Sequence, residues 1–412
     1  MQRDRNPLPT DTPENLGIPS AAVQRFVDAL SAKRLCMHGV LLLRHGHVAA
    51  EMYWEPFTAD SLHRMYSCSK SFVSVAIGCL EAEKRLSLDD AVAGFFPDKA
   101  GDGLHPYIAA TTIRDLLVMA APHLFGKVTY GRDMPDWADT FFKTPPTHLP
   151  GKIFSYDTTA TVMLTMIVER LVGMPFLEYL RPRLFDPMGC SEDMGCIETP
   201  CGYSWGGSGV LCTARDFAKF ALVCMRNGLH EGRHLLPEAY LRAATARQID
   251  NQVAGSDYEH TRGYGYQFWR ISHNGFACLG MGCQLAICLP DKDLVLITTA
   301  DTQGVNTASS TIFEALWREI YPSLSAGPLP PDPAARESLA TATANLSLPL
   351  AEGTVTSPMA ARVSGREFCM TTPGELPVRR VRFHFAGDLG TMEYENDTGR
   401  HSLSFGFGRL HQ

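Results

Sequence analysis

Hydrophobic residues are arranged along the chain as strand-like runs on either side of a mainly helical stretch. The segment GVLLLRHGHVAAEMYW (39–54) contains two apolar runs about His45-Gly46, which predicts a β-hairpin. From there to about residue 187 the patterns are mainly helical, most clearly over 159–171. Three strand-like runs follow farther along the chain: 264–271, 284–289 and 294–299. We predict a domain of the α/β (α+β) class, in which both ends complete one antiparallel sheet with helices packed on it.

A proline-rich stretch separates this region from a small β region. The stretch YPSLSAGPLPPDPAARES holds five of the 27 prolines and predicts a linker. Beyond it, short alternating runs between turn residues predict a small all-β domain: 378–385, 390–394 and 402–407. We therefore predict a main domain over 1–325 with a helical region inserted at about 85–200, a linker over 326–345 and a β domain over 346–412.

Composition narrows the class of protein. Of the 412 residues, 45% are hydrophobic and 20% charged, which is typical of a globular protein with a substantial core. The net charge is -7 and no basic run is interleaved with aromatic residues, so we expect no nucleic-acid partner. The amino-terminal residues are polar, and no apolar stretch reaches the roughly 18 residues of a membrane span, so we expect neither an export signal nor a membrane partner.

The twelve cysteines are spread along the chain, several of them inside apolar runs. Without an export signal, this distribution predicts reduced, mostly buried thiols and a cytoplasmic protein. The one cluster, Cys190, Cys196 and Cys201, has neither the usual zinc spacing nor a histidine. We therefore expect no metal site.

Candidate chemistry begins in the segment RMYSCSKSFVSVAIGCL. Ser67 and Lys70 are three residues apart, so both side chains lie on one face of a helix. A serine needs a neighbouring base to act as a nucleophile, and a desolvated lysine can serve because burial lowers its pKa. The helix is apolar on nearly every face over 72–80, where a lysine requires a partner or a purpose. The alternative is a helix-capping serine with an incidental lysine. Ser69 points elsewhere and Ser71 lies beyond the lysine, so Ser67 is the best-placed nucleophile.

The extended segment YSCSKSFVSVAIGCLEAEKRLSLDDAVAGFFPD, followed by IRDLLVMAA, resembles the first signature of the serine β-lactamase and penicillin-binding-protein superfamily. It is most similar to the class C-like branch, with its family VIII esterases, D,D-peptidases and nylon-oligomer hydrolases. The resemblance covers about residues 15–322, with four blocks in the family's order. It implies a β-lactamase-like antiparallel sheet flanked by helices, and acyl transfer through Ser67 with Lys70 as its base and no metal or organic cofactor.

A second block, PGKIFSYDTTATVML, resembles the family's segment with a tyrosine and, two residues later, an asparagine. It implies that Tyr156 is the catalytic tyrosine, which relays a proton beside Lys70 and later protonates the leaving group. Thr158 stands where the family often has the asparagine that helps to hold substrate amides. This departure argues against a β-lactamase.

The third signature falls in ACLGMGCQLAIC. The resemblance implies that Gly280 ends this motif and that the backbone N–H groups of Met281 and Ser67 form the oxyanion hole. Cys278, a candidate substrate-binding residue together with Thr158 and Gly280, stands where lactamases carry a lysine or histidine, so no cation is left there to bind a substrate carboxylate. Another block, GGSGVLCTARDFAKFALVCMRNG, appears in the family as a structural element, and Trp205 just before it is a candidate pocket wall.

These features predict a serine hydrolase that cleaves a small-molecule ester or amide through a Ser67 acyl-enzyme. One alternative is a D,D-peptidase or β-lactamase acting on cell-wall peptides or penicillins, and a second is a non-catalytic binding protein on the same fold. No Gly-x-Ser-x-Gly elbow occurs, which disfavours an α/β-hydrolase triad. His63 and His273 lie near the signature blocks, but each is better interpreted as a surface or supporting residue. The oligomeric state does not follow from these patterns.

Overall fold

The computed structural model describes residues 7–101, 103–124, 136–252, 258–350, 354, 356–371 and 378–408. The chain forms two compact units. The larger unit consists of Met1–Tyr53 and Ala59–Ala344, and the smaller one of Trp54–Thr58 and Asn345–Gln412. The candidate catalytic residues all belong to the larger unit.

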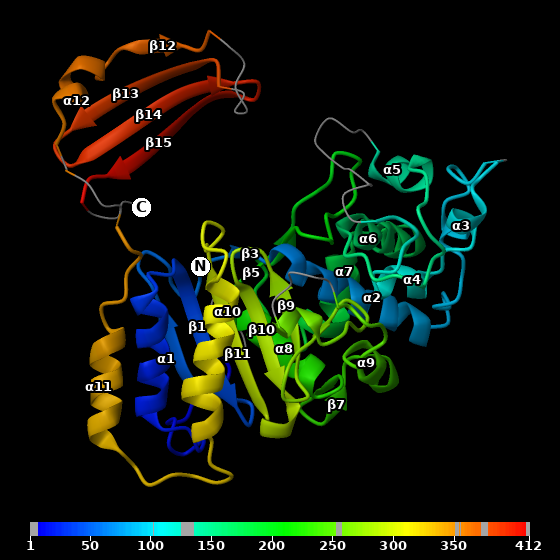
Figure 1. The fold of residues 1–412 in the computed structure, drawn as a ribbon, viewed down its shortest axis with the longest axis horizontal. Coiled ribbons are helices and arrows are strands. Elements are labelled where there is room, and N and C mark those ends of the chain that lie inside the picture. Colours follow the sequence, from blue (N-terminus) through cyan, green and yellow to red (C-terminus); the bar gives the residue numbers. More distant parts are fainter. Residues whose placement is uncertain are drawn as a thin grey trace. The chain divides into compact units, whose positions relative to one another are not determined.

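A six-stranded antiparallel sheet forms the centre of the larger unit (Figure 1). Its strand order is β2 (His47–Tyr53), β1 (Met37–Arg44), β11 (Leu294–Ala300), β10 (Gln284–Leu289), β9 (Phe276–Gly280), β8 (Trp269–Arg270). Strand β1 pairs with β11 in the register Leu41 to Ile297, so the two ends of the domain complete one sheet, as the sequence predicted. The predicted hairpin is also present, and its turn residues His45 and Gly46 have positive φ angles of 54° and 78°.

Helices cover the sheet. Helices α1 (Ser20–Ala32), α10 (Ala308–Ala315) and α11 (Pro333–Thr343) lie along one face (Figure 1). Helix α8 (Ala214–Met225) contacts β1, β10 and β11. Helix α11 corrects the prediction of a linker over 326–345. Proline is favourable at the first helical position, and Asp332 caps the helix by accepting a hydrogen bond from the backbone N–H of Ala335 at 2.9 Å.

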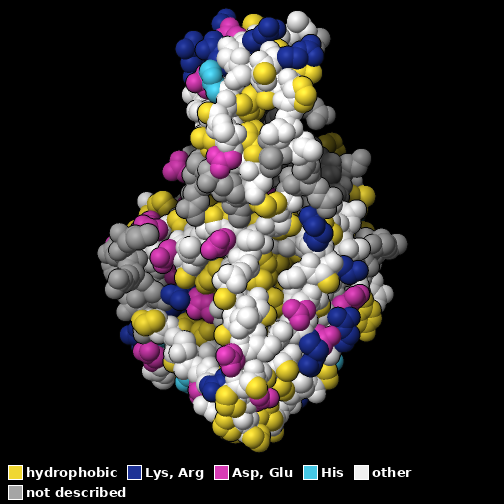
Figure 2. Space-filling view, turned by 90° about the vertical axis from the view of Figure 1, so that its left-hand side faces the viewer, with side chains coloured by type: hydrophobic (Ala, Val, Ile, Leu, Met, Phe, Trp, Pro, Cys, Tyr) yellow, Lys and Arg dark blue, Asp and Glu magenta, His cyan; other side chains and the backbone are white. Residues whose placement is uncertain are grey.

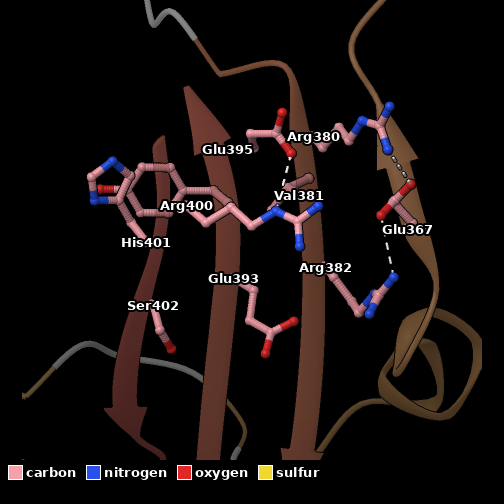
Figure 3. A pocket seen from close by; sticks show the side chains of 10 residues that line it. Glu367, Arg380, Val381, Arg382, Glu393, Glu395, Arg400, His401 and Ser402 are labelled. Carbon is pink, nitrogen blue, oxygen red and sulfur yellow. Dashed lines mark hydrogen bonds and ion pairs between the residues drawn. The ribbon is translucent and has the colours of Figure 1, made fainter. Parts of the chain in front are cut away.

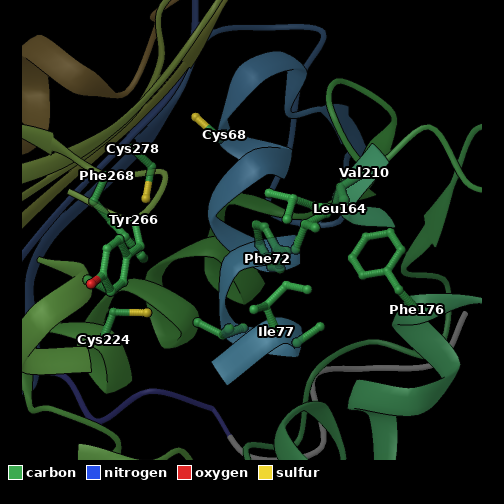
Figure 4. Packing of buried hydrophobic residues seen from close by; sticks show 14 of the residues in the cluster. Cys68, Phe72, Ile77, Leu164, Phe176, Val210, Cys224, Tyr266, Phe268 and Cys278 are labelled. Carbon is green, nitrogen blue, oxygen red and sulfur yellow. The ribbon is translucent and has the colours of Figure 1, made fainter. Parts of the chain in front are cut away.

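The inserted helical region packs around two buried helices, α2 (Ser69–Ala82) and α6 (Thr158–Val172). The other α-helices of the larger unit are α3 (Pro106–Ala109), α4 (Ile113–Leu117), α5 (Trp137–Lys143), α7 (Phe176–Leu180) and α9 (Glu238–Ala244). Every residue of α2 from Ser69 to Leu80 is buried, which confirms the prediction of a helix apolar on nearly every face. Phe72 stacks on Phe220 at a ring-centroid distance of 3.9 Å and lies beside Leu164 of α6 (Figure 4). This core fixes the helix that carries Lys70.

Two small sheets complete the described part of the larger unit. They are β3 (His63–Arg64), β4 (Gly195–Cys196) and β5 (Val210–Cys212) in one three-stranded sheet, and the pair β6 (Leu229–His230) and β7 (Arg233–His234). Acidic and basic side chains are interspersed on the face seen in Figure 2. Among the described residues no single helix is long and apolar enough to cross a membrane; α6 and Phe176–Phe185 pass that test only as a pair bent by 65°.

The smaller unit is built on a four-stranded antiparallel sheet, which confirms the prediction of a small all-β region. The strands are β12 (Glu367–Cys369), β13 (Arg380–Ala386), β14 (Leu389–Asn396) and β15 (Gly399–Gly406), with the short helix α12 (Pro358–Val363) before them. One face carries a row of charged side chains around a depression of about 390 Å³ (Figure 3). Glu367 pairs there with Arg380 and Arg382 at 3.3 and 3.2 Å. The three side chains are between 40% and 52% exposed, so each pair contributes about 1 kcal/mol or less to stability.

Two stacked histidines in the larger unit make its stability depend on pH. The rings of His38 and His63 are 5.2 Å apart. Burial lowers the pKa of each histidine to about 4. The charge of His38 also lowers the pKa of His63, whereas Asp301 opposes the shift at His38. Below about pH 6.5 the unfolded chain therefore binds protons that the folded chain does not bind until about pH 4, and stability falls over this interval as the pH falls.

We expect His63→Phe, which keeps a ring but cannot titrate, to reduce this loss. Between pH 7 and pH 5 the variant should lose about 1–2 kcal/mol less unfolding free energy than the wild type. Urea unfolding at both pH values measures the difference, with His234→Phe, at a histidine whose side chain is 47% exposed, as the matched control. An equal loss in wild type and His63→Phe would contradict the assignment.

Candidate active site

Ser67 lies in a 3₁₀ turn, Tyr66–Cys68, that leads directly into α2. The residue before it, Tyr66, has φ of +46°, in the left-handed region that non-glycine residues seldom adopt. This turn contacts strands β9 and β10. Strand β9 lies so close to the turn that a Cβ on Gly280 would overlap the carbonyl oxygen of Met65 and lie 3.1 Å from the Cys68 Sγ. Glycine at 280 therefore lets the edge of the sheet reach the turn that carries the candidate nucleophile.

The other two serines of this segment have structural roles. The Ser69 Oγ accepts a hydrogen bond from the Val210 N–H at 3.0 Å, and the Ser71 Oγ donates to the carbonyl oxygen of Gln267 at 2.7 Å. Both side chains are fully buried, whereas Ser67 lines a cleft. The structure thus separates Ser67 from its neighbours, as the helical spacing predicted.

The Lys70 amine is held by three oxygens. Its Nζ lies 3.0 Å from the Ser67 Oγ, 3.2 Å from the Thr158 Oγ1 and 2.7 Å from the carbonyl oxygen of Gly207. A neutral amine has two N–H groups and one lone pair. If the N–H groups bond Gly207 and Thr158, the lone pair is directed at the serine hydroxyl and can accept its proton.

Burial supplies the protonation state that this geometry needs. Lys70 is 1% exposed, and burial lowers its pKa to about 7. The nearby carboxylate of Asp157 acts in the opposite direction and favours the charged amine. Burial also raises the pKa of Asp157, while the hydrogen bond from the Thr159 N–H (2.9 Å) at the start of α6 opposes that rise. A substantial fraction of Lys70 is therefore neutral near pH 7.

Tyr156 forms the wall of the site beside this lysine. The Lys70 Nζ lies 5.1 Å from the centroid of the Tyr156 ring. The same ring packs against Trp269 at 5.3 Å and lies edge-on to Tyr264 at 6.3 Å. Tyr156 lines the same cleft as Ser67. The three residues proposed for the chemistry are thus brought together from segments 86 to 89 positions apart.

We expect Tyr156→Phe to lower kcat/KM for an ester by about 10²-fold, because one proton-transferring group is lost. The phenyl ring retains the packing against Trp269, so the melting temperature should change little. Tyr203→Phe, at a partly buried tyrosine whose hydroxyl accepts from Arg170 at 3.3 Å, is the control. Unchanged kinetics in Tyr156→Phe would show that its hydroxyl takes no part in proton transfer.

The turn after β9 also lines the cleft. Gly280 and Met281 both line the cleft with Ser67, and Met281 is 57% exposed. Cys278, predicted to contact substrate, is 2% exposed and lies in the core (Figure 4). Side chains alternate along a strand, and that of Cys278 points inward, where burial raises its pKa to about 12. It is therefore a core residue and not part of the described cleft lining.

Four other sequence candidates lie outside the described cleft lining. The ring of Trp205 packs under the Arg64 guanidinium at 4.5 Å and edge-on against Trp137 at 5.4 Å, so it supports the core. His63 is in the buried pair described above. The ring of His273 packs at a tilt against that of Tyr321, with 3.9 Å between the ring centroids, which agrees with its interpretation as a supporting residue. Thr158 contacts Lys70 from the start of α6 and helps to orient the amine.

The cleft has a volume of about 300 Å³. Its described lining residues are Ser67, Tyr156, His260, Trp269, Leu279, Gly280, Met281, Gly282, Cys283, Leu285, Thr302, Gln303, Val305, Asn306, Ala308 and Ser309. None of these is an aspartate, glutamate, lysine or arginine. Within the parts of the chain that the structure describes, no group of three histidine, cysteine or acidic side chains is placed to hold a metal ion.

Sequence reasoning missed His260 and Trp269. Both line the cleft, and their rings meet edge-on at 5.3 Å. His260 is positioned by the Asn251 amide, which donates to its carbonyl oxygen at 2.9 Å. Neither residue belongs to a signature block, and only the folding of the 258–270 segment against Tyr156 brings them to the site. No signal in the sequence marked them.

The sequence pattern of the Beta-lactamase family matches residues 20–316 of this chain. The chain belongs to the beta-lactamase family. The match covers the sheet, the inserted helical region and the candidate site, and it confirms the predicted resemblance and fold class.

Two relatives illustrate the range of the family. The 6-aminohexanoate-dimer hydrolase of Paenarthrobacter ureafaciens is 27% identical over 225 residues, which are 51% of this chain and 57% of that protein. Penicillin-binding protein 4* of Bacillus subtilis is 27% identical over 176 residues, 37% of this chain and 35% of that protein. The chain thus spans from about a third to little more than half the length of these relatives.

Solved structures share the fold. The octameric penicillin-binding protein homologue from Pyrococcus abyssi has a TM-score of 0.57 at 16% identity, covering 93% of this chain and 90% of that one. EstCE1, a hydrolase with promiscuous acyltransferase activity, has a TM-score of 0.58 at 16% identity, covering 72% and 98%. Likenesses at this level of identity show a common fold.

Proposed function

We propose that this protein is a serine hydrolase that cleaves a carboxylic ester or amide through an acyl-enzyme on Ser67. The observation that carries the proposal is the Lys70 amine, 3.0 Å from the Ser67 Oγ and with its pKa lowered by burial to about 7. A non-catalytic protein would not need a fully buried lysine kept partly neutral beside an accessible serine. The relatives named as hydrolases support the same class of activity.

In the acylation step, neutral Lys70 takes the proton of the Ser67 hydroxyl while its oxygen attacks the substrate carbonyl carbon. The backbone N–H groups of Ser67 and Met281 stabilise the negative charge on the carbonyl oxygen. Tyr156, whose ring borders the amine, relays a proton to the leaving alcohol or amine. In the second step water attacks the acyl-enzyme, gives up a proton to the same groups and releases the acid.

The described lining bears on the substrate. It contains apolar side chains, amides, hydroxyls and one histidine, His260, with no aspartate, glutamate, lysine or arginine to pair with a charged substrate group. Cys278, at the position where lactamases carry a cation, is buried. We infer that the part of the substrate bound in this cleft is uncharged, which favours a neutral ester or amide over a peptide or penicillin bound by its carboxylate.

A burst assay with p-nitrophenyl acetate and butyrate, combined with intact-mass analysis, tests the proposal. We expect a rapid first turnover and a single acyl adduct that maps to Ser67. A fluorophosphonate probe should label the same residue. Absence of both the adduct and the label on folded protein would overturn the proposed function.

A further inference from the structure

Gln284, the first residue of β10, has a buried side chain whose amide is fully used. It is 2% exposed. Its Nε2 donates to the carbonyl oxygen of Ala300 at 2.6 Å and to that of Met281 at 3.1 Å. Its Oε1 accepts from the Ala300 N–H at 3.2 Å. The side chain thus pairs with the end of β11 as a backbone strand would and, through its second donor, holds the turn that ends β9.

This turn needs support because its conformation is unusual. Gly282 and Cys283 have φ angles of 74° and 66°, and a left-handed conformation is unfavourable for cysteine. The hydroxyl of Thr298 donates to the carbonyl oxygen of Cys283 at 2.7 Å, so the far side of the turn is also held. Gln284 holds the near side, at the carbonyl group of Met281. The Met281 carbonyl belongs to the peptide plane after this residue, and its N–H belongs to the plane before it. Gly280 pairs with Gln284 in the β9–β10 ladder, so Gln284 restrains Met281 on both sides and thereby the direction of the Met281 N–H.

Gln284 is also tied to the nucleophile. Its backbone carbonyl oxygen lies 3.0 Å from the Cys68 Sγ, which donates to it. Cys68 follows Ser67 directly and is 1% exposed. One residue therefore joins both sides of the site, through its side chain to Met281 and through its backbone to the residue beside Ser67.

We propose that Gln284 is a positioning residue, which sets the distance and orientation between the N–H groups of Ser67 and Met281. The inference rests on the proposed function, because these two groups are its oxyanion hole. Such donors stabilise the transition state only when they are placed within a fraction of an ångström, and a displacement of about 1 Å costs up to about 10²-fold in rate.

The test is Gln284→Met, which keeps the length and buried volume of the side chain but removes its amide. We expect kcat on p-nitrophenyl butyrate to fall about 10- to 100-fold with KM nearly unchanged, because acylation and deacylation use the same oxyanion hole and slow together. Fluorophosphonate should still label Ser67 completely at long times. Gln248→Met is the control, since Gln248 is exposed and donates to the Ala243 carbonyl oxygen at 2.8 Å, outside the site.

A pair of inhibitors separates positioning from general destabilisation. A trifluoromethyl ketone forms a tetrahedral oxyanion with the serine, whereas the matching methyl ketone binds without a stable adduct. In Gln284→Met the Ki of the trifluoromethyl ketone should rise by the factor that kcat/KM loses, and that of the methyl ketone should stay constant. A lower melting temperature with unchanged kcat and Ki would show a purely structural role.

If Gln284→Met does not fold, Cys68→Ala tests the other tie. Loss of the thiol donor should give a smaller fall in kcat of the same kind, and Cys68→Ser, which keeps a donor, should restore part of it. Full activity in Cys68→Ala would overturn the proposal. Failure of the proposed function can be told apart from failure of this inference, because the wild type itself would then show no labelling at Ser67.

Discussion

Ser67→Ala is expected to abolish ester turnover, with kcat reduced about 10⁴-fold or more, because the atom that forms the acyl bond is removed. The substitution deletes one oxygen that faces a cleft, so the fold and its melting temperature should be preserved. Initial rates with p-nitrophenyl butyrate and the mass of the protein after incubation measure both aspects. The variant should show neither an acyl adduct nor a fluorophosphonate label.

The neighbouring serine provides the control. Ser69→Ala removes the acceptor of the Val210 N–H and should lower stability by about 1–3 kcal/mol, yet the acyl adduct should still form on Ser67. If Ser67→Ala retained an adduct that Ser69→Ala lost, the assignment of the nucleophile would be wrong.

Lys70→Met should reduce kcat/KM about 10³-fold, since no base remains to accept the serine proton. In the wild type, activity requires the neutral amine, so kcat/KM should be low in acid, rise as the pH increases through about 7 and level off above that value. The variant should lose this inflection. A pH profile from 5 to 9 on both proteins measures the effect.

Lys70→Arg distinguishes a base from a positive charge. A guanidinium keeps the charge but does not release its proton in this range, so the variant should be nearly as inactive as Lys70→Met. Activity within about tenfold of the wild type, with the inflection near pH 7 retained, would mean that another group takes the proton.

Much of the fold was accessible from the sequence because its signals are local. Two apolar runs about His45-Gly46 predicted the hairpin, and an apolar helix after Ser67 predicted the buried α2. Lys70 could be singled out since a lysine in such a helix requires a reason. Helix α11 was missed because a high proline content masked one proline, Pro333, at a position where a helix favours it.

The rest of the site depends on contacts between distant segments. In the sequence Gln284 is an ordinary strand residue. Only the structure, in which β10 lies beside the end of β11, shows that its amide donates to the carbonyl oxygens of Met281 and Ala300. His260 and Trp269 reach the cleft through the packing of an irregular segment on Tyr156. Cys278 was misjudged since its motif position was known but the inward direction of its side chain was not.

The pairing of β1 with β11 has a consequence for synthesis of the protein on the ribosome. Leu41 cannot pair with its partner Ile297 until that residue has been synthesised, 256 residues later. At about 5–20 residues per second this delay is on the order of ten to fifty seconds. During that time β1 can pair only with β2, and the backbone N–H and C=O groups of its other edge are open to wrong partners. The edge of β1 that pairs with β11 is therefore a site of possible mispairing in the newly made chain until residue 300 has emerged.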